Sequence, residues 1–290
     1  MATNTGFIGL GAMGLSMARN LHAAGLLNGV WNRSSAKAKA LAAELGCTAF
    51  ETPAELAASC AVIFICVSRD DDVLGVIDQL AGNLHSASIV VDCSTVAVET
   101  AQQASFRVGQ SDGAFLDAPV SGGTEGAKNG TLAIMVGGEA AVIQQLEPQF
   151  QAIGSRVEHM GDVGSGQGTK AVNQIVAAGV YQGVTEALAF AAAMQLPLAK
   201  VIDVVGSGAA GNWFLQHRGP AMCEGVYEPG FKVELHDKDL RICQRMAAKH
   251  GVELQSIERC LQDYAQLMAM GHGNEDTSAL FRLKKELFTG

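Results

Sequence analysis

The stretch GFIGLGAMGLSMARNL, residues 6–21, decides the fold of this chain. An apolar run leads into a G-x-G-x-x-G pattern, and a helical pattern follows it. In such a strand–turn–helix unit the first glycine makes a tight turn, the second lets the backbone approach a pyrophosphate, and the third allows close packing of helix on strand. Free N–H groups at the start of the helix favour an anion. The predicted dinucleotide contacts are Gly9, Gly11, Ala12, Met13 and Gly14.

Strand-like and helix-like segments alternate around this motif. The apolar runs TGFIGL, GVWN, AVIFICVS and SIVVDCST are separated by helical patterns such as SAKAKALAAELG and DDVLGVIDQLAGNL. Because the runs are apolar throughout, they predict a parallel sheet covered by helices on both faces. AFLDAPV and TLAIMVGG predict two more strands joined by a Gly-rich loop, SGGTEGAKNG, and AAVIQQLEPQFQAIG predicts one helix before a strand near RVEHMG. The expected fold class is α/β, with a doubly wound parallel sheet in a domain of residues 1–163.

The rest of the chain has helical patterns without strand signals. The expected helices cover 168–194, 198–205, 236–250, 254–271 and 278–287. The first would be roughly 40 Å long at ~1.5 Å per residue, which is long enough to bridge two domains. Residues 164–290 are therefore expected to form a second, all-α domain for substrate binding and oligomerisation, beginning with this interdomain helix.

Composition excludes several classes of function. The 290 residues carry a formal net charge of -9 without a basic cluster, which argues against nucleic acid and anionic membrane surfaces as partners. The seven cysteines form no CxxC pair and the seven histidines no HxH or HxxxH pair, which predicts reduced thiols and no metal site. No export signal precedes the first strand, so a cytoplasmic location is expected. The stretch 171–193 is interrupted by polar residues such as Asn173 and Glu186 and is expected to be a buried helix rather than a membrane span.

The end of the second predicted strand indicates which dinucleotide is bound. An acidic residue about 20 positions after the glycines normally binds the adenosine ribose, but this chain has Asn32, Arg33 and Ser34 there. A carboxylate would repel a 2′-phosphate by about 4 kcal/mol per charge pair at contact, whereas an amide, a guanidinium and a hydroxyl would accept it. These residues predict NADP, with NAD less favoured. The alternative is that Arg33 is a solvated residue opening a helix capped at Ser34 or Ser35.

Lys170 stands near the start of the long apolar helix in GSGQGTKAVNQIVAAG, residues 164–179. Asn173 and Gln174 follow it on the same helical face. We expect partial desolvation to lower the pKa of this lysine from about 10.4 towards the range of a general acid or base. The alternative is a lysine that extends to solvent at a helix start.

Two further motifs offer polar groups. In DAPVSGG, residues 117–123, Ser121, Gly122 and Gly123 would present a hydroxyl and bare N–H groups suited to a carboxylate, although a simple turn would look the same. In FKVELHDKDL, residues 231–240, Lys238 and Asp239 are expected to open a helix and could be only a surface charge pair.

Together the motifs resemble the β-hydroxyacid dehydrogenase family, which contains 3-hydroxyisobutyrate dehydrogenase, tartronate semialdehyde reductase and the glyoxylate/succinic semialdehyde reductases, with 6-phosphogluconate dehydrogenase more distantly. The resemblance covers nearly the whole chain through GFIGLGAMGLSMARNL, DCSTV, DAPVSGGTEGAKNGTLAIMVGG, GSGQGTKAVNQ and KDL. It implies a Rossmann domain joined by a long helix to an all-α domain, the site between them, and homo-oligomers, dimers or tetramers, built through the helical domain.

The resemblance also implies residue roles. Lys170 would be the catalytic acid/base with Asn173 and Gln174 nearby, and the loop from Ser121 to Gly123 would hold the substrate carboxylate. Gln174 stands where the phosphogluconate branch has Asn, which points away from a sugar phosphate. The expected cofactor contacts are Val67, Ser68, Thr95, Phe231 and Lys238. Trp213 and Phe231 are also candidate walls of the substrate pocket, with a core role for either as the alternative.

The expected function is an NADP-dependent oxidoreductase that interconverts a small hydroxyacid and its semialdehyde or oxo acid by hydride transfer. One alternative is a catalytically silent dinucleotide-binding module. Another is an imine reductase of the same fold, for which Asp or Tyr would be expected in place of Lys170. VWNRSSAKAKAL is more similar to the NADP-dependent glyoxylate and succinic semialdehyde reductases, whereas the other motifs do not distinguish among small carboxylate substrates.

Overall fold

The computed structural model describes residues 4–288. The chain divides into two compact units, of which the first ends at Lys170 and the second begins at Ala171. The expected boundary at residue 164 precedes the long helix, whereas the compact units divide inside it.

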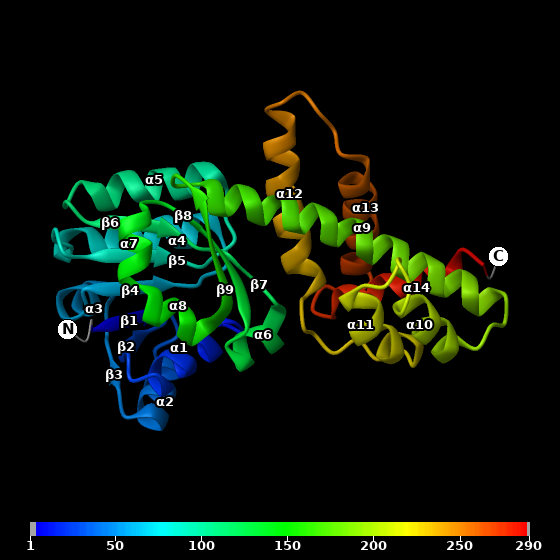
Figure 1. Cartoon of the computed structure of the whole chain (residues 1–290), viewed down its shortest axis with the longest axis horizontal. Helices are drawn as coiled ribbons and strands as arrows, with labels where there is room; N and C mark the ends of the chain where they lie inside the picture. The colour runs from blue at the N-terminus through cyan, green and yellow to red at the C-terminus, as the bar shows by residue number, and fades with distance from the viewer. Residues whose placement is uncertain (1–3, 289–290) are drawn as a thin grey trace. The chain divides into compact units, whose positions relative to one another are not determined.

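The first unit is a sheet with helices on both faces (Figure 1). Its strands are β1 (Thr5–Ile8), β2 (Leu27–Trp31), β3 (Thr48–Ala49), β4 (Val62–Ile65), β5 (Ile89–Asp92), β6 (Ala114–Asp117), β7 (Val120–Ser121), β8 (Leu132–Gly137) and β9 (Gly154–Gly161). Its helices are α1 (Gly14–Ala23), α2 (Ser35–Leu45), α3 (Pro53–Ser59), α4 (Asp70–Leu80), the 3-10 turn η1 (Ala81–Asn83), α5 (Val98–Gly109), α6 (Gly123–Asn129), α7 (Ala140–Gln145) and α8 (Glu147–Ile153).

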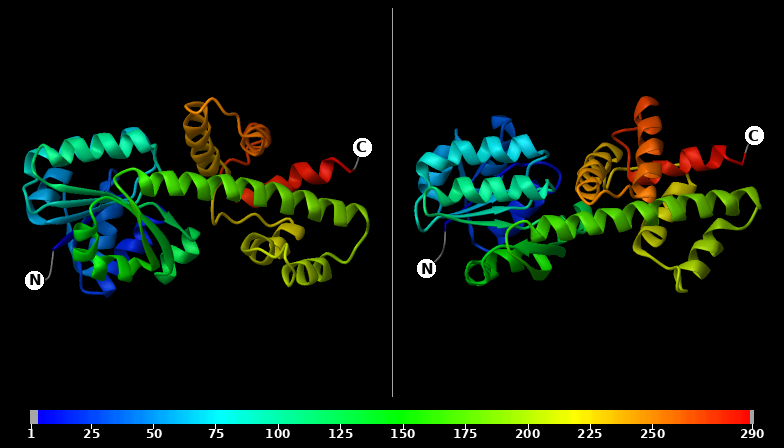
Figure 2. Two further views of the ribbon diagram at one scale, coloured as in Figure 1. Left: turned by 45° about the horizontal axis from the view of Figure 1, so that its top comes forward. Right: turned by 90° about the horizontal axis from the view of Figure 1, so that it is seen from above.

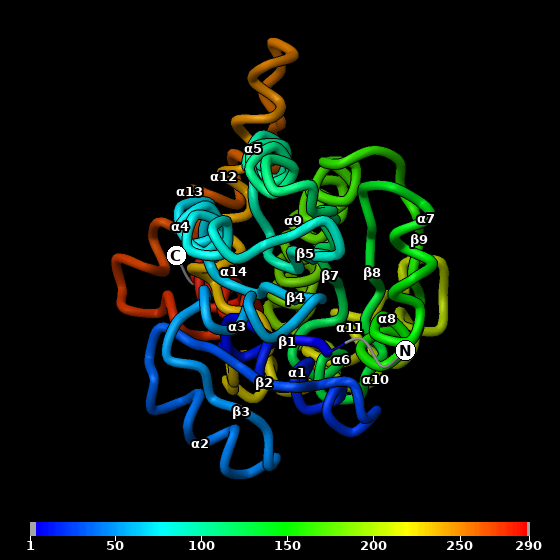
Figure 3. The backbone as a smooth tube through the Cα atoms, turned by 90° about the vertical axis from the view of Figure 1, so that its left-hand side faces the viewer, coloured from blue at the N-terminus to red at the C-terminus, as the bar shows by residue number. Residues whose placement is uncertain are grey.

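The strand order is β3-β2-β1-β4-β5-β6-β8-β7, with β9 pairing with β8. Figure 3 shows β2, β1, β4 and β5 following one another across the sheet. β1 to β6 pair in parallel, while β8 runs antiparallel to β6 and β7. This mostly parallel sheet confirms the expected α/β class. The order reverses between β1 and β4, and at such a reversal the carboxyl ends of the strands leave a crevice for a ligand.

Both faces of the sheet are buried, as the apolar strands predicted. Phe7 and Phe64 pack on one face against α1, α2 and α8, whereas Ile8, Ile63 and Ile65 pack on the other against α3, α4 and α5. Alternate residues of one strand therefore enter different cores, which polar residues at either set of positions would disrupt.

The Gly-rich turn after β1 depends on two glycines for its shape. Gly9 has φ +96°, and a Cβ there would overlap the backbone oxygen of Cys66. A Cβ on Gly14 would overlap the backbone oxygen of Gly9. Gly11 has nothing within 4 Å of its Cβ position, so its bare backbone faces open space.

Two expectations for the first unit were wrong. The segment expected as a Gly-rich loop contains α6, which Gly130 ends in the left-handed conformation and which carries Glu125 in its first turn and Lys128 in its last. These charges complement the helix dipole. The sequence did not indicate α6 because its high glycine content is typical of a loop. The segment after β8 forms two helices rather than one, because the chain breaks at Leu146 before Pro148.

The second unit is helical. Its helices are α9 (Ser165–Ala193, which starts in the first unit), α10 (Leu198–Gly206), α11 (Trp213–Cys223), α12 (Val233–Ala248), α13 (Gln255–Ala269), the 3-10 turn η2 (Thr277–Ala279) and α14 (Leu280–Glu286). The sequence did not indicate α11, whose pattern Pro220 interrupts. α12 begins at Val233, so Lys238 and Asp239 lie inside this helix instead of opening it.

α9 is one uninterrupted helix (Figure 2). Within residues 4–288 it is the one helix whose length and hydropathy would suit a membrane span, and 33% of its most apolar window is buried. The core helix of a globular protein can have the same length and hydropathy, so these two properties do not identify a membrane-spanning helix. Its exposed apolar side chains include Val172, Val176 and Phe190, which lie on one side of the helix.

Gly14→Ala should lower the free energy of unfolding by about 1–3 kcal/mol, because the added methyl group overlaps backbone that cannot move aside. Gly11→Ala is the matched control and should stay within about 0.5 kcal/mol of the wild type. Urea denaturation of both variants measures the difference, and equal losses would contradict this account of the turn.

Candidate active site

A buried carboxylate anchors the start of α9. Asp117, the last residue of β6, accepts a hydrogen bond from the Gly164 N–H on Oδ1 (2.7 Å) and from the Gln167 N–H on Oδ2 (2.8 Å). Burial raises the pKa of Asp117, and the backbone N–H donors oppose that rise. Gly166 lies against the same residue, because a Cβ there would overlap the backbone of Met135 and Asp117. The carboxylate therefore fixes the first turn of α9 to the end of the sheet.

Gln167 links this turn to the segment after β5. Its side chain is buried, its Oε1 accepts a hydrogen bond from the Val96 N–H (3.1 Å), and its Nε2 donates to the Ser94 carbonyl (2.8 Å). Thr95, which is half-buried, lies between these two contacts. The amide therefore holds the backbone on both sides of Thr95.

Ser94 extends the same network to the segment after β4. Its hydroxyl accepts a hydrogen bond from the Val67 N–H at 2.9 Å. Val67 and Ser68 thus belong to a segment that is hydrogen-bonded to the Thr95 segment, at the carboxyl ends of neighbouring parallel strands.

Lys170 reaches the third segment of this edge. Its side chain is buried, with 7% of the residue exposed, and its Nζ donates a hydrogen bond to the Val120 carbonyl at 2.8 Å. Val120 precedes Ser121, and Gly122 and Gly123 follow with φ +134° and +63°. Side chains larger than hydrogen rarely adopt these values. The structure therefore brings the lysine to the Ser121–Gly123 loop, and Lys170 does not extend to solvent.

The residues expected to bind the adenosine end of the cofactor follow β2, the strand beside β1 and its Gly-rich turn. Asn32 accepts a hydrogen bond from the Leu10 N–H on Oδ1 (2.9 Å) and donates through Nδ2 to the Ser34 carbonyl (3.2 Å). Arg33 and Ser34 are exposed. Asn32 thus holds its own turn against the Gly-rich turn, and Arg33 and Ser34 stay exposed beside it.

These features fit a dinucleotide. Gly11 is bare towards open space, Ala12 is exposed, and Met13 is partly exposed before the first turn of α1. A pyrophosphate at this helix N-terminus would accept hydrogen bonds from the free N–H groups of the first turn.

The second unit holds a separate polar cluster. Gln174 donates a hydrogen bond through Nε2 to Asp239 Oδ2 (2.7 Å) and accepts one on Oε1 from Asn173 Nδ2 (2.7 Å). Lys238 Nζ lies 3.0 Å from Asp239 Oδ1. Within the second unit, Gln174 and the KDL motif, far apart in sequence, therefore meet through the buried Asp239.

His236 connects this cluster to Phe231, one of the two expected aromatic residues. It is fully buried, with Nδ1 2.7 Å from the Tyr264 hydroxyl and Nε2 3.3 Å from the Gln174 carbonyl oxygen. The Phe231 ring centroid lies 5.3 Å from that of His236. Trp213 stacks on His217 and is 49% exposed, so it is not a core residue. The structure groups Phe231 with Gln174 but does not place Trp213 in that cluster.

Sequence reasoning missed the residues that build the frame of the site. Asp117, Ser94 and Gln167 all stand inside motifs that drew attention, but their roles come from hydrogen bonds between segments distant in the chain. The available signal was their polarity: each is a hydrogen-bonding residue at the end of an apolar strand or at the start of an apolar helix.

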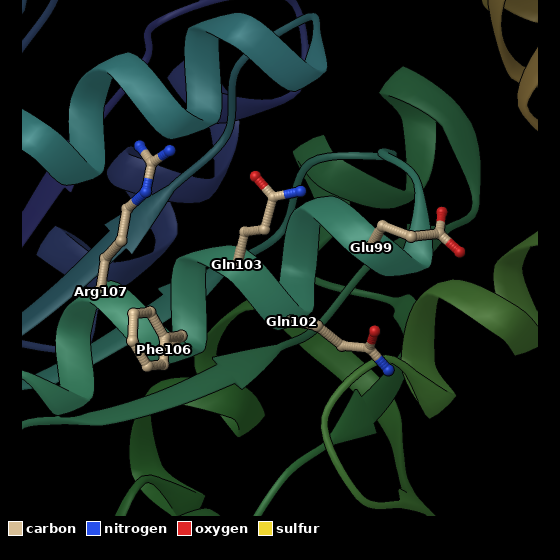
Figure 4. A pocket seen from close by; sticks show the side chains of 5 residues that line it. All are labelled: Glu99, Gln102, Gln103, Phe106 and Arg107. Atoms are coloured by element: carbon tan, nitrogen blue, oxygen red, sulfur yellow. The ribbon is translucent and has the colours of Figure 1, made fainter.

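A pocket also lies along α5, lined by Glu99, Gln102, Gln103, Phe106 and Arg107 (Figure 4). No expected site residue lines it. Its lining has neither a nucleophile nor paired acid and base groups, and Arg107 is bound to Asp78. The carboxyl edge of the sheet therefore remains the better candidate. Within residues 4–288, no group of three or more His, Cys, Asp or Glu residues is placed to hold a metal ion.

The sheet topology, the Gly-rich turn and the helical unit define an NAD(P)-binding oxidoreductase. A protein-family model described as the NAD binding domain of 6-phosphogluconate dehydrogenase matches residues 4–161 of this chain. The model described as NAD-binding of NADP-dependent 3-hydroxyisobutyrate dehydrogenase matches residues 164–284. The chain belongs to the β-hydroxyacid dehydrogenase family, whose members are NAD(P)-dependent dehydrogenases and reductases of small hydroxyacids.

Relatives match the chain along nearly its whole length. An uncharacterized oxidoreductase of Shewanella frigidimarina is 38% identical over 96% of this chain and 97% of its own. The 2-hydroxy-3-oxopropionate reductase of Escherichia coli is 34% identical over 95% of this chain and 94% of its own. A solved structure of Mycobacterium tuberculosis 3-hydroxyisobutyrate dehydrogenase with L-serine is 28% identical, has a TM-score of 0.87, and covers 98% of this chain and 99% of that chain.

Asp117→Asn should destabilise the protein by about 1.5–3 kcal/mol, because an amide has one acceptor oxygen for two buried N–H donors. Asp162→Asn removes the same charge from an exposed residue near the start of α9 and should have little effect. Chemical denaturation at neutral pH compares the two. An Asp117→Asn variant as stable as the wild type would show that the anchor is dispensable.

Proposed function

We propose that the protein is an NADP-dependent reductase or dehydrogenase of a short hydroxyacid and its semialdehyde or oxo acid, with Lys170 as the acid/base. The observation that carries this proposal is the buried Lys170 side chain, whose Nζ donates a hydrogen bond to the Val120 carbonyl, next to the Ser121–Gly123 loop. A silent dinucleotide-binding module would need no buried lysine there, and an imine reductase would be expected to have Asp or Tyr in its place.

The Ser121–Gly123 loop would bind the substrate carboxylate through a hydroxyl and bare backbone N–H groups. This contact would fix the reacting carbon relative to Lys170, which is hydrogen-bonded to Val120 next to the same loop. The bound nicotinamide would supply or accept the hydride.

Lys170 would move the proton at the substrate oxygen. In the reductive direction Nζ would donate a proton to the carbonyl oxygen, and in the oxidative direction it would accept the hydroxyl proton. The Val120 carbonyl accepts a hydrogen bond from Nζ and so holds the side chain beside the Ser121–Gly123 loop. The proposed contacts of the second unit are Asn173, Gln174 and Trp213 for the substrate and Phe231 and Lys238 for the cofactor.

The preference for NADP over NAD rests on the turn after β2. Asn32 occupies the place of the usual acidic residue and is used to hold the turn, while Arg33 and Ser34 are exposed and can meet a 2′-phosphate. The proposed substrate is a small carboxylate, as the names of the relatives suggest. We place the reaction in the cytoplasm.

We also propose that the protein is a homo-oligomer. In the second unit, Val172, Val176 and Phe190 are between 54% and 61% exposed along one side of α9, and Met194, directly after the helix, is 58% exposed. A side this apolar on a helix of a globular enzyme is suited to a second copy of the chain.

Lys170→Ala should lower kcat for reduction by about 100-fold or more, while NADPH binding changes little, because the proton donor is lost and the Gly-rich turn is untouched. Lys170→Arg should lower kcat as well, since a guanidinium does not release its proton. Initial rates with glyoxylate, succinic semialdehyde, tartronate semialdehyde and methylmalonate semialdehyde provide the test. Turnover by the Ala variant at the wild-type rate would exclude Lys170 as acid/base.

Val176→Glu should shift the protein to a smaller species in size-exclusion chromatography with light scattering, because it places a charge in the proposed interface. Val252→Glu, the same substitution at an exposed valine outside α9, is the control and should leave the assembly unchanged. A wild-type monomer would contradict the oligomer proposal.

A further inference from the structure

Arg33 has a charged protein neighbour. Its Nη1 lies 3.0 Å from Oδ1 of Asp72, with the Arg33 side chain 86% exposed and that of Asp72 26% exposed. Because the guanidinium is so exposed, the pair is weak and can open when another anion arrives.

The ion pair spans the expected adenosine site. Arg33 follows β2, and Asp72 lies in the first turn of α4, which follows β4. β1 lies between these two strands and carries the Gly-rich turn. A cofactor whose pyrophosphate lies on that turn would extend its adenosine ribose towards the end of β2, where the ion pair stands.

Asp72 differs from the two acidic residues before it. Asp70 is turned towards α5, since its Oδ1 accepts hydrogen bonds from the Ala97 N–H (2.8 Å) and the Thr100 hydroxyl (2.6 Å). Asp71 is exposed. All three favour the N-terminus of α4 through the helix dipole, but Asp72 is the member that contacts Arg33.

We propose that Asp72 is a specificity-determining residue that competes with the 2′-phosphate of NADP(H) for Arg33. This inference rests on the proposed role of Arg33 in NADP binding. The phosphate must displace the carboxylate from the guanidinium, and the two anions then repel each other at short range. The 2′-hydroxyl of NAD(H) meets no such competition. Asp72 therefore moderates the preference for NADP(H) that Arg33 creates.

The test measures dissociation constants of NADPH and NADH by nucleotide fluorescence, without substrate. Asp72→Asn should tighten NADPH binding by about 3–10-fold and leave NADH binding within about twofold, and added salt should shrink the gain. Asp71→Asn is the matched control, because it removes the same charge from the same helix turn, and it should change neither constant by more than about twofold. In an Arg33→Ala background, Asp72→Asn should have lost most of its effect on NADPH.

Three results would overturn the proposal: unchanged or weaker NADPH binding in Asp72→Asn, an equal gain in Asp71→Asn, or an undiminished gain without Arg33. Failure of the NADP preference itself has a different signature. Wild-type protein that binds NADPH no better than NADH, combined with an Asp72→Asn variant that prefers NADPH, would support the role of Asp72 while contradicting the wild-type preference. If Arg33→Ala left the NADPH dissociation constant unchanged, both proposals would fall.

Discussion

The carboxylate of Asp117 fixes the first turn of α9, and the rest of the candidate site in the first unit depends on this anchor. Once Gly164 and Gln167 are held by its two oxygens, the Gln167 side chain can reach both sides of Thr95 and Lys170 can reach Val120. Burial raises the pKa of Asp117 while the N–H donors stabilise its ionised form. A buried carboxylate without those donors would cost several kcal/mol, so the anchor and the helix start depend on each other.

The residues that hold the backbone of the candidate site differ from those proposed to take part in the reaction. Asp117, Ser94 and Gln167 hydrogen-bond to backbone groups, whereas Lys170 and the Ser121–Gly123 loop are the groups proposed to contact the substrate. This division suits an enzyme that transfers a hydride, because the reacting atoms must be held close while few groups of the protein react. It also explains a largely apolar helix with a polar start: most apolar residues pack or lie on the exposed side, and the polar ones at the start organise the edge of the sheet.

The sequence predicted the fold better than the site. The apolar strands and the G-x-G-x-x-G turn were sufficient for a doubly wound sheet, because both depend on local pattern and on the close packing that Gly9 and Gly14 require. The helix α6 was missed because its glycines looked like a loop, and α11 because Pro220 breaks its pattern. Asp117 and Gln167 could not be assigned, since their hydrogen bonds join residues that only the folded chain brings together. The same holds for Asp72, which the sequence gives no reason to pair with Arg33.

The central claim is that the Lys170 amine moves the proton at the substrate oxygen, and chemical rescue tests it most directly. In Lys170→Ala, the shortened side chain leaves room for a small primary amine beside the Ser121–Gly123 loop. The account predicts that methylamine and related amines restore the reduction rate in proportion to their concentration, with the rate depending on the pKa of the amine. If the variant binds NADPH and substrate normally and no amine restores its rate, the lysine is not the proton donor.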